Sequence, residues 1–242
     1  MTRSVEPLEM VHCPVYGTGE TISVPVLRQV ARLQSAHQDI AIVDTEAYGR
    51  CLALGGVIQT ASTDHADYDA ALLRDLSPAT QSLLIIGGGD GCVAAAALER
   101  QPFLTVTVAE IDPAVAALCN QHFTRGIFDD PRVTLAITDV LSFSPKGRFD
   151  GIAIDLSDEP VEECGARSVT ETYDTLIGRL PFWLNPKGWV AVQAGAESVK
   201  PGLLDLARVI ETRVQDVFGH AERDAVFVAS YGEKNAFVYW RR

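Results

Sequence analysis

The amino-acid sequence predicts an α/β fold: a doubly wound, mostly parallel sheet with helices on both faces, preceded by a small antiparallel β region. Three observations support this prediction. From residue 82 onward, short apolar runs alternate with helical segments, as they do in βαβ units. Before residue 62, apolar and polar residues alternate as in half-buried strands. The 242 residues suffice for one large domain and a small addition, so we divide the chain into residues 1–62 and 63–242.

In the first part of the chain the hydrophobic periodicity is weak up to residue 20 and clear after residue 38. Residues 1–20 carry little periodicity, and we expect them to form a loose arm. Between residues 38 and 60 the alternation predicts a small antiparallel meander, whose turns fall at Gly49 and at Gly55–Gly56. Residues 64–75, which open the second part, have the pattern of a capped helix.

The second part of the chain alternates strands and helices. Units of this length predict a parallel sheet with an antiparallel edge, and such sheets bind ligands at the carboxyl ends of their strands. Pro113 suits the first turn of a helix. We expect strands at residues 82–87, 104–112, 132–139, 149–155, 188–195, 224–230 and 235–240, and helices at residues 92–100, 113–123, 168–182 and 201–217.

Composition and charge exclude several classes of protein. The chain has a formal net charge of −12 and no stripe of Lys or Arg, so we expect no nucleic-acid partner, whereas such a surface attracts cations. No apolar run reaches the ~18 residues of a membrane span, so we expect no membrane association. The five cysteines are scattered without a CxxC pair, which favours free thiols and a cytoplasmic location. The five histidines form no HxH or HExxH pattern, so we expect no metal.

Polar residues stand where the predicted parallel strands end. The first four strands are followed by or end on Asp90, Glu110, Asp139 and Asp155, and the fifth delivers Gln193. The carboxyl ends of parallel strands meet at one edge of the sheet, which is where ligands bind. We therefore expect these side chains to surround one ligand.

A glycine cluster follows the first of these strands, in the segment "LIIGGGDGCV". Gly87, Gly89 and Gly91 form a GxGxG pattern that lacks the third glycine of a dinucleotide fingerprint and the Lys-Ser/Thr of a P-loop. This pattern suits a nucleoside without phosphates. Glu110 ends the next strand, where an acid can accept hydrogen bonds from both ribose hydroxyls.

Asp90 lies inside that glycine cluster and restricts the ligand further. A phosphate about 4 Å from this carboxylate would be repelled by about 4 kcal/mol at an effective dielectric constant near 20. The ligand is therefore expected to be cationic here. A sulfonium nucleoside with an amine tail meets this requirement, which indicates S-adenosylmethionine or its decarboxylated form.

Asp155 and Asp158 follow the fourth strand three residues apart, so both can face one cavity. An amine has a reference pKa of about 10.4 and must lose a proton before it attacks carbon. One carboxylate can accept that proton, and the other can hold a second ammonium of the substrate. The pair therefore predicts chemistry on an amine.

Several segments, in this order, resemble the spermidine synthase (polyamine aminopropyltransferase) family over about residues 35–240. The stretch "SAHQDIAIVDTEAYGRCLALGGVIQT" is similar to the family's S-x-Y-Q-x-I … G-x-x-L-x-L-D-G-x-x-Q, and "DHADYDA" is similar to its D-E-x-x-Y-H-E. The segments "LLIIGGGDG", "AEID", "FDGIAIDLSD" and "VAVQAGAE" follow at the family's spacing, and "ASYGEKNAFVY" resembles its late tyrosine segment. GGGDG together with D-x-S-D is the most specific pair.

The resemblance implies a Rossmann-like fold of the class I S-adenosylmethionine methyltransferase type, with residues 63–242 as the catalytic domain. It implies transfer of the aminopropyl group of decarboxylated S-adenosylmethionine to a small cationic di- or polyamine. It also implies a homodimer or homotetramer.

The same resemblance implies roles for individual residues. Asp155 would deprotonate the attacking amine, and Asp158 would help to hold the acceptor. The donor would contact Gln38, Gly87, Gly89, Asp90, Gly91, Glu110 and Asp139, with Asp90 facing the aminopropyl ammonium, Glu110 the ribose and Asp139 the adenine. The acceptor side would be lined by Gln59, Tyr68, Gln193 and Tyr231.

The chain departs from the family pattern mainly on the acceptor side. Departures occur at Gly55, Asp69, Ala70, Ala95, Ala96 and Ser230 and in the loop at 159–170. Two alternatives therefore stay open at this point. One is an S-adenosylmethionine-dependent N-methyltransferase or another alkyl-transfer enzyme acting on an amine, and the other is a non-catalytic protein that binds a nucleoside or polyamine.

Overall fold

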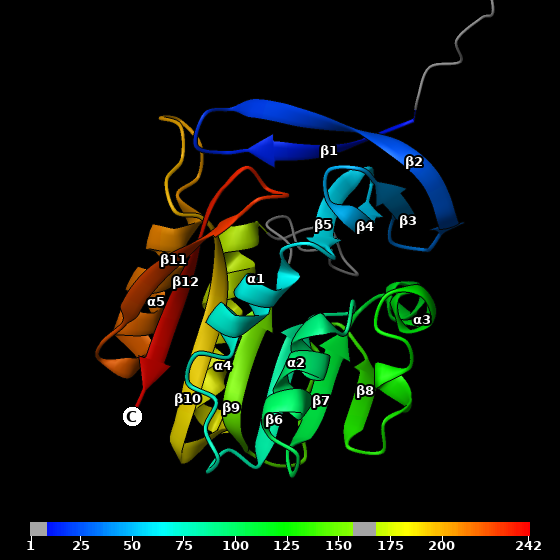
Figure 1. Cartoon of the computed structure of the whole chain (residues 1–242). Coiled ribbons are helices and arrows are strands. Elements are labelled where there is room, and N and C mark those ends of the chain that lie inside the picture. The colour runs from blue at the N-terminus through cyan, green and yellow to red at the C-terminus, as the bar shows by residue number, and fades with distance from the viewer. Residues whose placement is uncertain (1–8, 157–167) are drawn as a thin grey trace, which may run out of the picture.

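A computed structural model describes residues 9–156 and 168–242, and its strands and helices form two units stacked on one another (Figure 1). The N-terminal strands form a small closed barrel, and the rest of the described chain forms a seven-stranded sheet with helices on both faces. The α/β fold predicted from the sequence is confirmed. Within the described residues, no helix is both long and apolar enough to cross a membrane.

The barrel contains the predicted meander together with a preceding hairpin. The turns at Gly49, Gly55 and Gly56 have φ values of 66°, 57° and 82°, which favour glycine and confirm the predicted turn positions. Neighbouring strands are antiparallel, and β1 closes the barrel by a parallel contact with β5. The strands are β1 (Met10–Val15), β2 (Glu20–Gln34), β3 (Asp39–Thr45), β4 (Gly49–Leu54) and β5 (Val57–Ala61).

The expectation of a loose arm over residues 1–20 is wrong for its second half. Met10–Val15 is a strand whose alternate residues Val11, Cys13 and Val15 are buried in the barrel. The apolar alternation in each strand is short, Val11 to Val15 in β1 and Ile22 to Val26 in β2, and most of β2 is exposed, so the sequence signal is weak. Pairing between the two strands, and not local sequence, fixes this hairpin.

The sheet has the strand order β11-β12-β10-β9-β6-β7-β8, which can be followed from left to right in Figure 1. The strands from β10 to β8 are parallel, and β12 is antiparallel to both β10 and β11. The antiparallel strand is thus second from the edge. The strands are β6 (Ser82–Gly87), β7 (Thr105–Glu110), β8 (Val133–Ile137), β9 (Phe149–Asp155), β10 (Leu184–Ala196), β11 (Glu222–Val228) and β12 (Glu233–Arg241).

Helices cover the two faces of the sheet with separate apolar cores. On one face, α1 (His65–Leu72) and α2 (Cys92–Arg100) pack against the strands. On the other face lie α4 (Val169–Trp183) and α5 (Leu206–Phe218). The three tryptophans are buried in these cores, as their apolar character predicts.

The helix α3 (Pro113–His122) connects the sheet to the barrel, and a short 3-10 turn, η1 (Ile127–Asp129), follows it. Val115 and Cys119 of α3 pack against Ile40, Ile42 and Leu52 of the barrel. This apolar contact fixes the barrel relative to the sheet.

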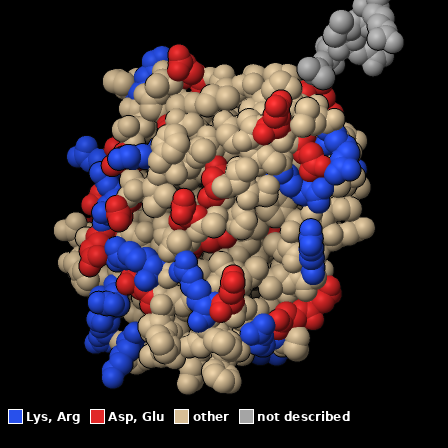
Figure 2. Space-filling model, viewed as in Figure 1, with Lys and Arg blue, Asp and Glu red and all other residues tan. Residues whose placement is uncertain are grey.

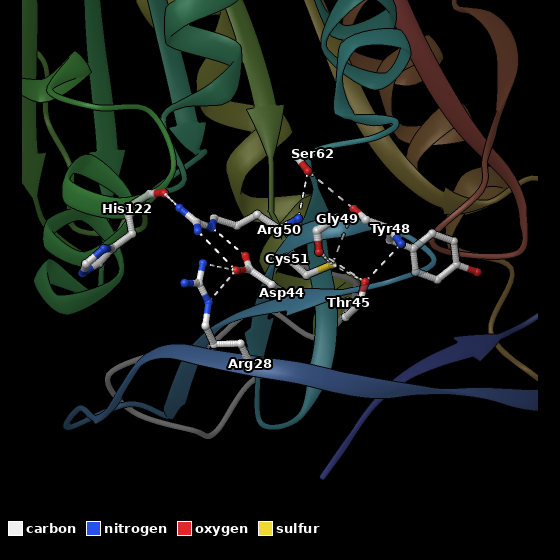
Figure 3. A network of polar contacts seen from close by, with 9 residues as sticks. All are labelled: Arg28, Asp44, Thr45, Tyr48, Gly49, Arg50, Cys51, Ser62 and His122. Carbon is white, nitrogen blue, oxygen red and sulfur yellow. Dashed lines mark hydrogen bonds and ion pairs between the residues drawn. The ribbon is translucent and has the colours of Figure 1, made fainter. Parts of the chain in front are cut away.

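A polar network strengthens the same junction (Figure 3). The guanidinium of Arg50 donates to Asp44 Oδ1 at 2.9 Å and to the backbone oxygen of His122, at the end of α3, at 3.0 Å. Arg28 binds the same carboxylate from β2. The hydrogen bond from Arg50, together with that from Arg28, lowers the pKa of Asp44 despite its partial burial. Arg50 is therefore the one member of this trio that reaches α3.

We predict that Arg50→Ala lowers the free energy of unfolding by about 1 kcal/mol, because it removes a partly exposed charged hydrogen bond across the junction. Arg28→Ala is the matched control, since the side chain of Arg28 binds the same carboxylate but is 66% exposed and makes no hydrogen bond or ion pair with α3 among the described residues. Urea unfolding of both variants measures the difference. Equal losses would contradict a bridging role for Arg50.

Candidate active site

A cavity of about 390 Å³ lies between the barrel and the carboxyl ends of the sheet strands. Strand ends of the sheet form one wall, and β1, β4 and β5 of the barrel form another. Most residues that the sequence predicts for the site line this cavity, namely Gln38, Gln59, Tyr68, Gly87, Gly89, Asp90, Glu110, Asp155, Gln193 and Tyr231. The structure therefore brings together residues from distant segments as predicted.

The glycine loop after β6 runs in close contact with the ends of the two neighbouring strands. A Cβ atom on Gly87 would lie 2.2 Å from the backbone oxygen of Asp155, and φ at Gly87 is 80°. A Cβ atom on Gly89 would lie 2.6 Å from Oε2 of Glu110. A larger residue at Gly87 would displace the backbone end of β9, and one at Gly89 would displace the carboxylate of Glu110, so the two glycines help to place the ends of both strands.

Gly91 does not line the cavity. It takes a left-handed conformation, with φ of 79°, at the N-cap of α2, and a Cβ atom there would lie 2.5 Å from Ile127. Its requirement for glycine thus comes from packing behind the loop.

Asp90 connects the glycine loop to the barrel. Its Oδ2 accepts a hydrogen bond from the Thr60 hydroxyl of β5 at 2.5 Å, and its Oδ1 accepts from the backbone nitrogen of Cys92 at 2.9 Å. Cys92 itself is buried, and burial raises the pKa of its thiol, as for a small packed residue. Both oxygens of Asp90 are fixed on the cavity wall.

Asp155 ends β9 next to this wall. The Tyr68 hydroxyl of α1 donates to its Oδ1 at 2.6 Å. Burial and the nearby charge of Asp90 raise the pKa of Asp155, and the hydrogen bond from Tyr68 opposes this rise only in part. The ring of Tyr68 is itself held edge-on against Phe237 and Tyr231. Asp155 is thus an oriented carboxylate with increased proton affinity.

Glu110 ends β7 and is 8% exposed. Burial raises its pKa to about 7 although the backbone nitrogen of Asp112 donates to Oε1 at 2.8 Å. Asp112 was not predicted as a site residue. It caps α3 by accepting from the backbone nitrogen of Ala114 at 3.0 Å, and its other oxygen accepts from Gln38 Nε2 at 3.3 Å. The Asp112–Pro113 pair is the sequence signal that identifies this N-cap.

Asp139 lies in a smaller adjoining cavity of about 40 Å³. Gly87, Glu110 and Leu156 line both cavities, so the two spaces share a wall. The Oδ1 of Asp139 accepts from the backbone nitrogen of Leu141 at 2.8 Å. Asp139 therefore lies next to Gly87 and Glu110, at the part of the site that they line.

The opposite end is formed by residues of β10, β12 and the barrel. Gln193 donates to Asn235 Oδ1 at 3.0 Å, and the Tyr231 hydroxyl donates to the backbone oxygen of Gln59. Glu233 accepts hydrogen bonds from two backbone nitrogens in the turn after β1. The β1 residues that line this end were missed because their segment was expected to be a loose arm; they are Cys13 and Pro14, with Tyr16 in the following turn.

Two further predictions concern the edges of the site. Asp64 occupies the N-cap position of α1, but its side chain does not cap the helix. It accepts instead from the backbone nitrogen of Ser230 at 2.6 Å, which ties α1 to the loop before β12. Asp158 and most of the altered loop at 159–170 lie outside the described residues.

The charge distribution limits what the cavity can bind. Its described lining includes Asp64, Asp69, Asp90, Glu110, Asp155 and Glu233. No Lys or Arg belongs to the lining among residues 9–156 and 168–242. Figure 2 shows acidic side chains in the middle of this face, whereas many Lys and Arg side chains gather toward its lower left. A cationic ligand would compensate the buried carboxylates.

Comparison with known proteins identifies the family. A family model described as the spermine/spermidine synthase domain matches residues 72–241, and one described as the spermidine synthase tetramerisation domain matches residues 8–62. The chain belongs to the spermine/spermidine synthase family. The family resemblance predicted from the motifs is therefore confirmed.

Two relatives match this chain over different shares of its length. Polyamine aminopropyltransferase 1 of Hyperthermus butylicus is 27% identical, with 96% of this chain and 82% of that protein covered. The polyamine aminopropyltransferase of Klebsiella pneumoniae strain 342 is 37% identical over 50% of this chain and 46% of its own length.

Solved structures of the family share the fold. A spermidine synthase in complex with the transition-state analogue AdoDATO has a TM-score of 0.81 at 22% identity, and the comparison covers the whole of this chain and 83% of that chain. The spermidine synthase of Thermotoga maritima has a TM-score of 0.80 at 20% identity, with the same coverage. These values support the Rossmann-like assignment of the sheet.

We predict that Gly89→Ala weakens binding of methylthioadenosine at least tenfold while changing the melting temperature little. The added methyl group would displace Glu110 from the nucleoside end of the cavity. Gly147→Ala is the control, because nothing lies within 4 Å of the position of its Cβ atom. Isothermal titration calorimetry measures both affinities, and unchanged binding by Gly89→Ala would contradict the role given to this contact.

A second prediction concerns pH and stability. The pKa of Glu110 is raised from 4.5 to about 7 in the folded protein, so the folded state binds the proton more tightly than the unfolded state. The resulting contribution to the free energy of unfolding is fully present below pH 4.5 and is lost as the pH rises through about 7. The loss is roughly 3 kcal/mol. In Glu110→Gln this component of the pH dependence should be absent. Urea unfolding between pH 4.5 and 8 tests this, with exposed Glu99→Gln as control; parallel curves for wild type and Glu110→Gln would contradict it.

Proposed function

We propose that this protein transfers the aminopropyl group of decarboxylated S-adenosylmethionine to an amine. In the reaction a nitrogen of the acceptor attacks the propyl carbon next to sulfur. A carbon–nitrogen bond forms and the carbon–sulfur bond breaks, which releases methylthioadenosine as a neutral thioether. The acceptor nitrogen loses one proton. The names of the relatives support this class of transferase.

The observation that carries the proposal is the pairing of Asp155 with Asp90 in one acidic cavity beside Glu110. Decarboxylated S-adenosylmethionine carries a sulfonium and an ammonium, and the described lining supplies carboxylates without Lys or Arg. We assign the ribose to Glu110 and the ammonium to Asp90. Gln38 and Asp139 complete the nucleoside end on this proposal.

Asp155 is the proposed base. Its increased proton affinity suits a group that accepts a proton from an amine, because a general base acts best when its pKa lies near the operating pH. The hydrogen bond from Tyr68 fixes the carboxylate through Oδ1. The other oxygen can then face the acceptor nitrogen. Beyond deprotonation, the site acts by holding the two reactants in line.

The acceptor is proposed to occupy the end formed by Gln59, Gln193 and Tyr231, with Tyr68 and Asp158 beside it. Side chains with hydrogen-bonding groups line this end together with Glu233, so a second ammonium of a di- or polyamine would find an acceptor there. We also propose a homo-oligomer, which the match of residues 8–62 to the tetramerisation domain supports.

The test is to identify the nucleoside product. The protein is incubated separately with S-adenosylmethionine and its decarboxylated form in the presence of putrescine or spermidine, and products are analysed by mass spectrometry. We expect methylthioadenosine and a longer polyamine from the decarboxylated donor. Formation of S-adenosylhomocysteine would instead indicate methyl transfer and overturn the proposal, and binding without any turnover would indicate a non-catalytic protein.

A variant separates chemistry from binding. We predict that Asp155→Asn lowers turnover at least a thousandfold while donor affinity changes less than threefold, because the amide cannot accept the proton. This magnitude lies within the usual contribution of a general base, about 10² to 10⁴. Single-turnover kinetics and calorimetry measure the two quantities. An active Asp155→Asn would show that another group is the base.

A further inference from the structure

Asp69 of α1 is a buried carboxylate on the cavity wall that the mechanism above does not use. It is 2% exposed and lines the cavity together with Asp90 and Asp155. His65 Nδ1 lies 2.9 Å from its Oδ2. Among the described residues, no donor contributes a hydrogen bond to its Oδ1. One oxygen of this carboxylate is therefore fixed, and the other is available to a ligand.

The charge of Asp69 acts on the same part of the site as Asp90. Burial and the charge of Asp90 raise the pKa of Asp69 to about 6, and the hydrogen bond from His65 opposes the rise. Asp69 also contributes to the raised pKa of Asp155. At pH 8 the carboxylate of Asp69 is ionised, so the wall carries a buried negative charge in addition to that of the half-buried Asp90.

The sequence around Asp69 shows that this charge is a feature of this chain. Where the family pattern reads D-E-x-x-Y-H-E, this chain reads D-H-A-D-Y-D-A from residue 64 to 70. The acid and the histidine have exchanged places four residues apart, a spacing that keeps both on one face of a helix. The exchange moves the carboxylate from the start of α1 to the position of Asp69.

We propose that Asp69 is a specificity-determining residue for the donor. Asp90 and Asp69 together favour a donor tail that ends in an ammonium alone and disfavour one that keeps a carboxylate beside it. In the decarboxylated donor both acids attract the tail. In S-adenosylmethionine the attraction of the ammonium and the repulsion of the carboxylate largely cancel. This inference rests on the proposed function, whose donor it specifies further.

Three ligands separate this effect from a general loss of structure. Decarboxylated S-adenosylmethionine has the ammonium, S-adenosylmethionine has both charged groups, and methylthioadenosine has neither. We expect Asp69→Asn at pH 8 to weaken binding of the decarboxylated donor about tenfold, which is the size of a partly screened Coulomb attraction between a carboxylate and an ammonium. The affinities of the other two ligands should change less than threefold. Asp67→Asn, an exposed acid on the same helix, is the matched control and should change none of the three.

A second variant and a melting curve guard against misfolding. Asp69→His places the residue of the family pattern at this position and removes the same negative charge, so it should lower the preference for the decarboxylated donor in the same direction. An equal loss of affinity for all three ligands, or an unchanged preference in folded variants, would overturn the inference. If the variants give either of these results while the wild-type protein converts the decarboxylated donor, the proposed function still holds and only the role of Asp69 is overturned. A wild-type protein that binds neither sulfonium ligand contradicts both.

Discussion

The structure depends on burying several carboxylates in one cavity whose described lining contains no Lys or Arg. Each acid is held by a hydrogen bond from a different element: Asp90 by Thr60 of the barrel, Asp155 by Tyr68 of α1, and Glu110 by a backbone nitrogen before α3. Such burial costs stability because charged groups lose hydration. The same loss of hydration raises the proton affinity of Glu110 and Asp155. On the proposed function, binding of the cationic donor offsets this cost.

This arrangement explains why the barrel and the sheet must be fixed to one another. The barrel supplies Thr60 to Asp90, and a shift of the barrel would remove that hydrogen bond. Two contacts prevent such a shift: the apolar packing of α3 on the barrel and the bridge from Arg50 to the end of α3. Asp112 joins these roles, because it caps α3 and binds Gln38 on the barrel side of the site. The contacts that stabilise the junction therefore also fix the position of Gln38 and Asp90 on the cavity wall.

Most of the sheet and the nucleoside end could be predicted from sequence. Strand ends and glycine spacing are local signals in the sequence. The carboxyl ends of parallel strands lie at one edge of the sheet whatever the order of the strands. The hairpin before residue 38 could not be predicted, because Met10–Val15 becomes a strand by pairing with a segment that has no strong pattern of its own. For the same reason Tyr16, in the turn after β1, was not foreseen as a residue that lines the cavity.

The sequence by itself determined the class of fold, the family and the cationic character of the ligand, because these follow from periodicity, from motif order and from the presence of Asp90 beside the glycines. Only the tertiary structure decided which acids are buried and which of their oxygens are already bonded. Asp64 and Asp69 lie five residues apart and both line the cavity, yet the first accepts a hydrogen bond from the backbone before β12 and the second is paired with His65 of its own helix. Burial and hydrogen bonding depend on what packs from distant parts of the chain, and local sequence does not contain that information.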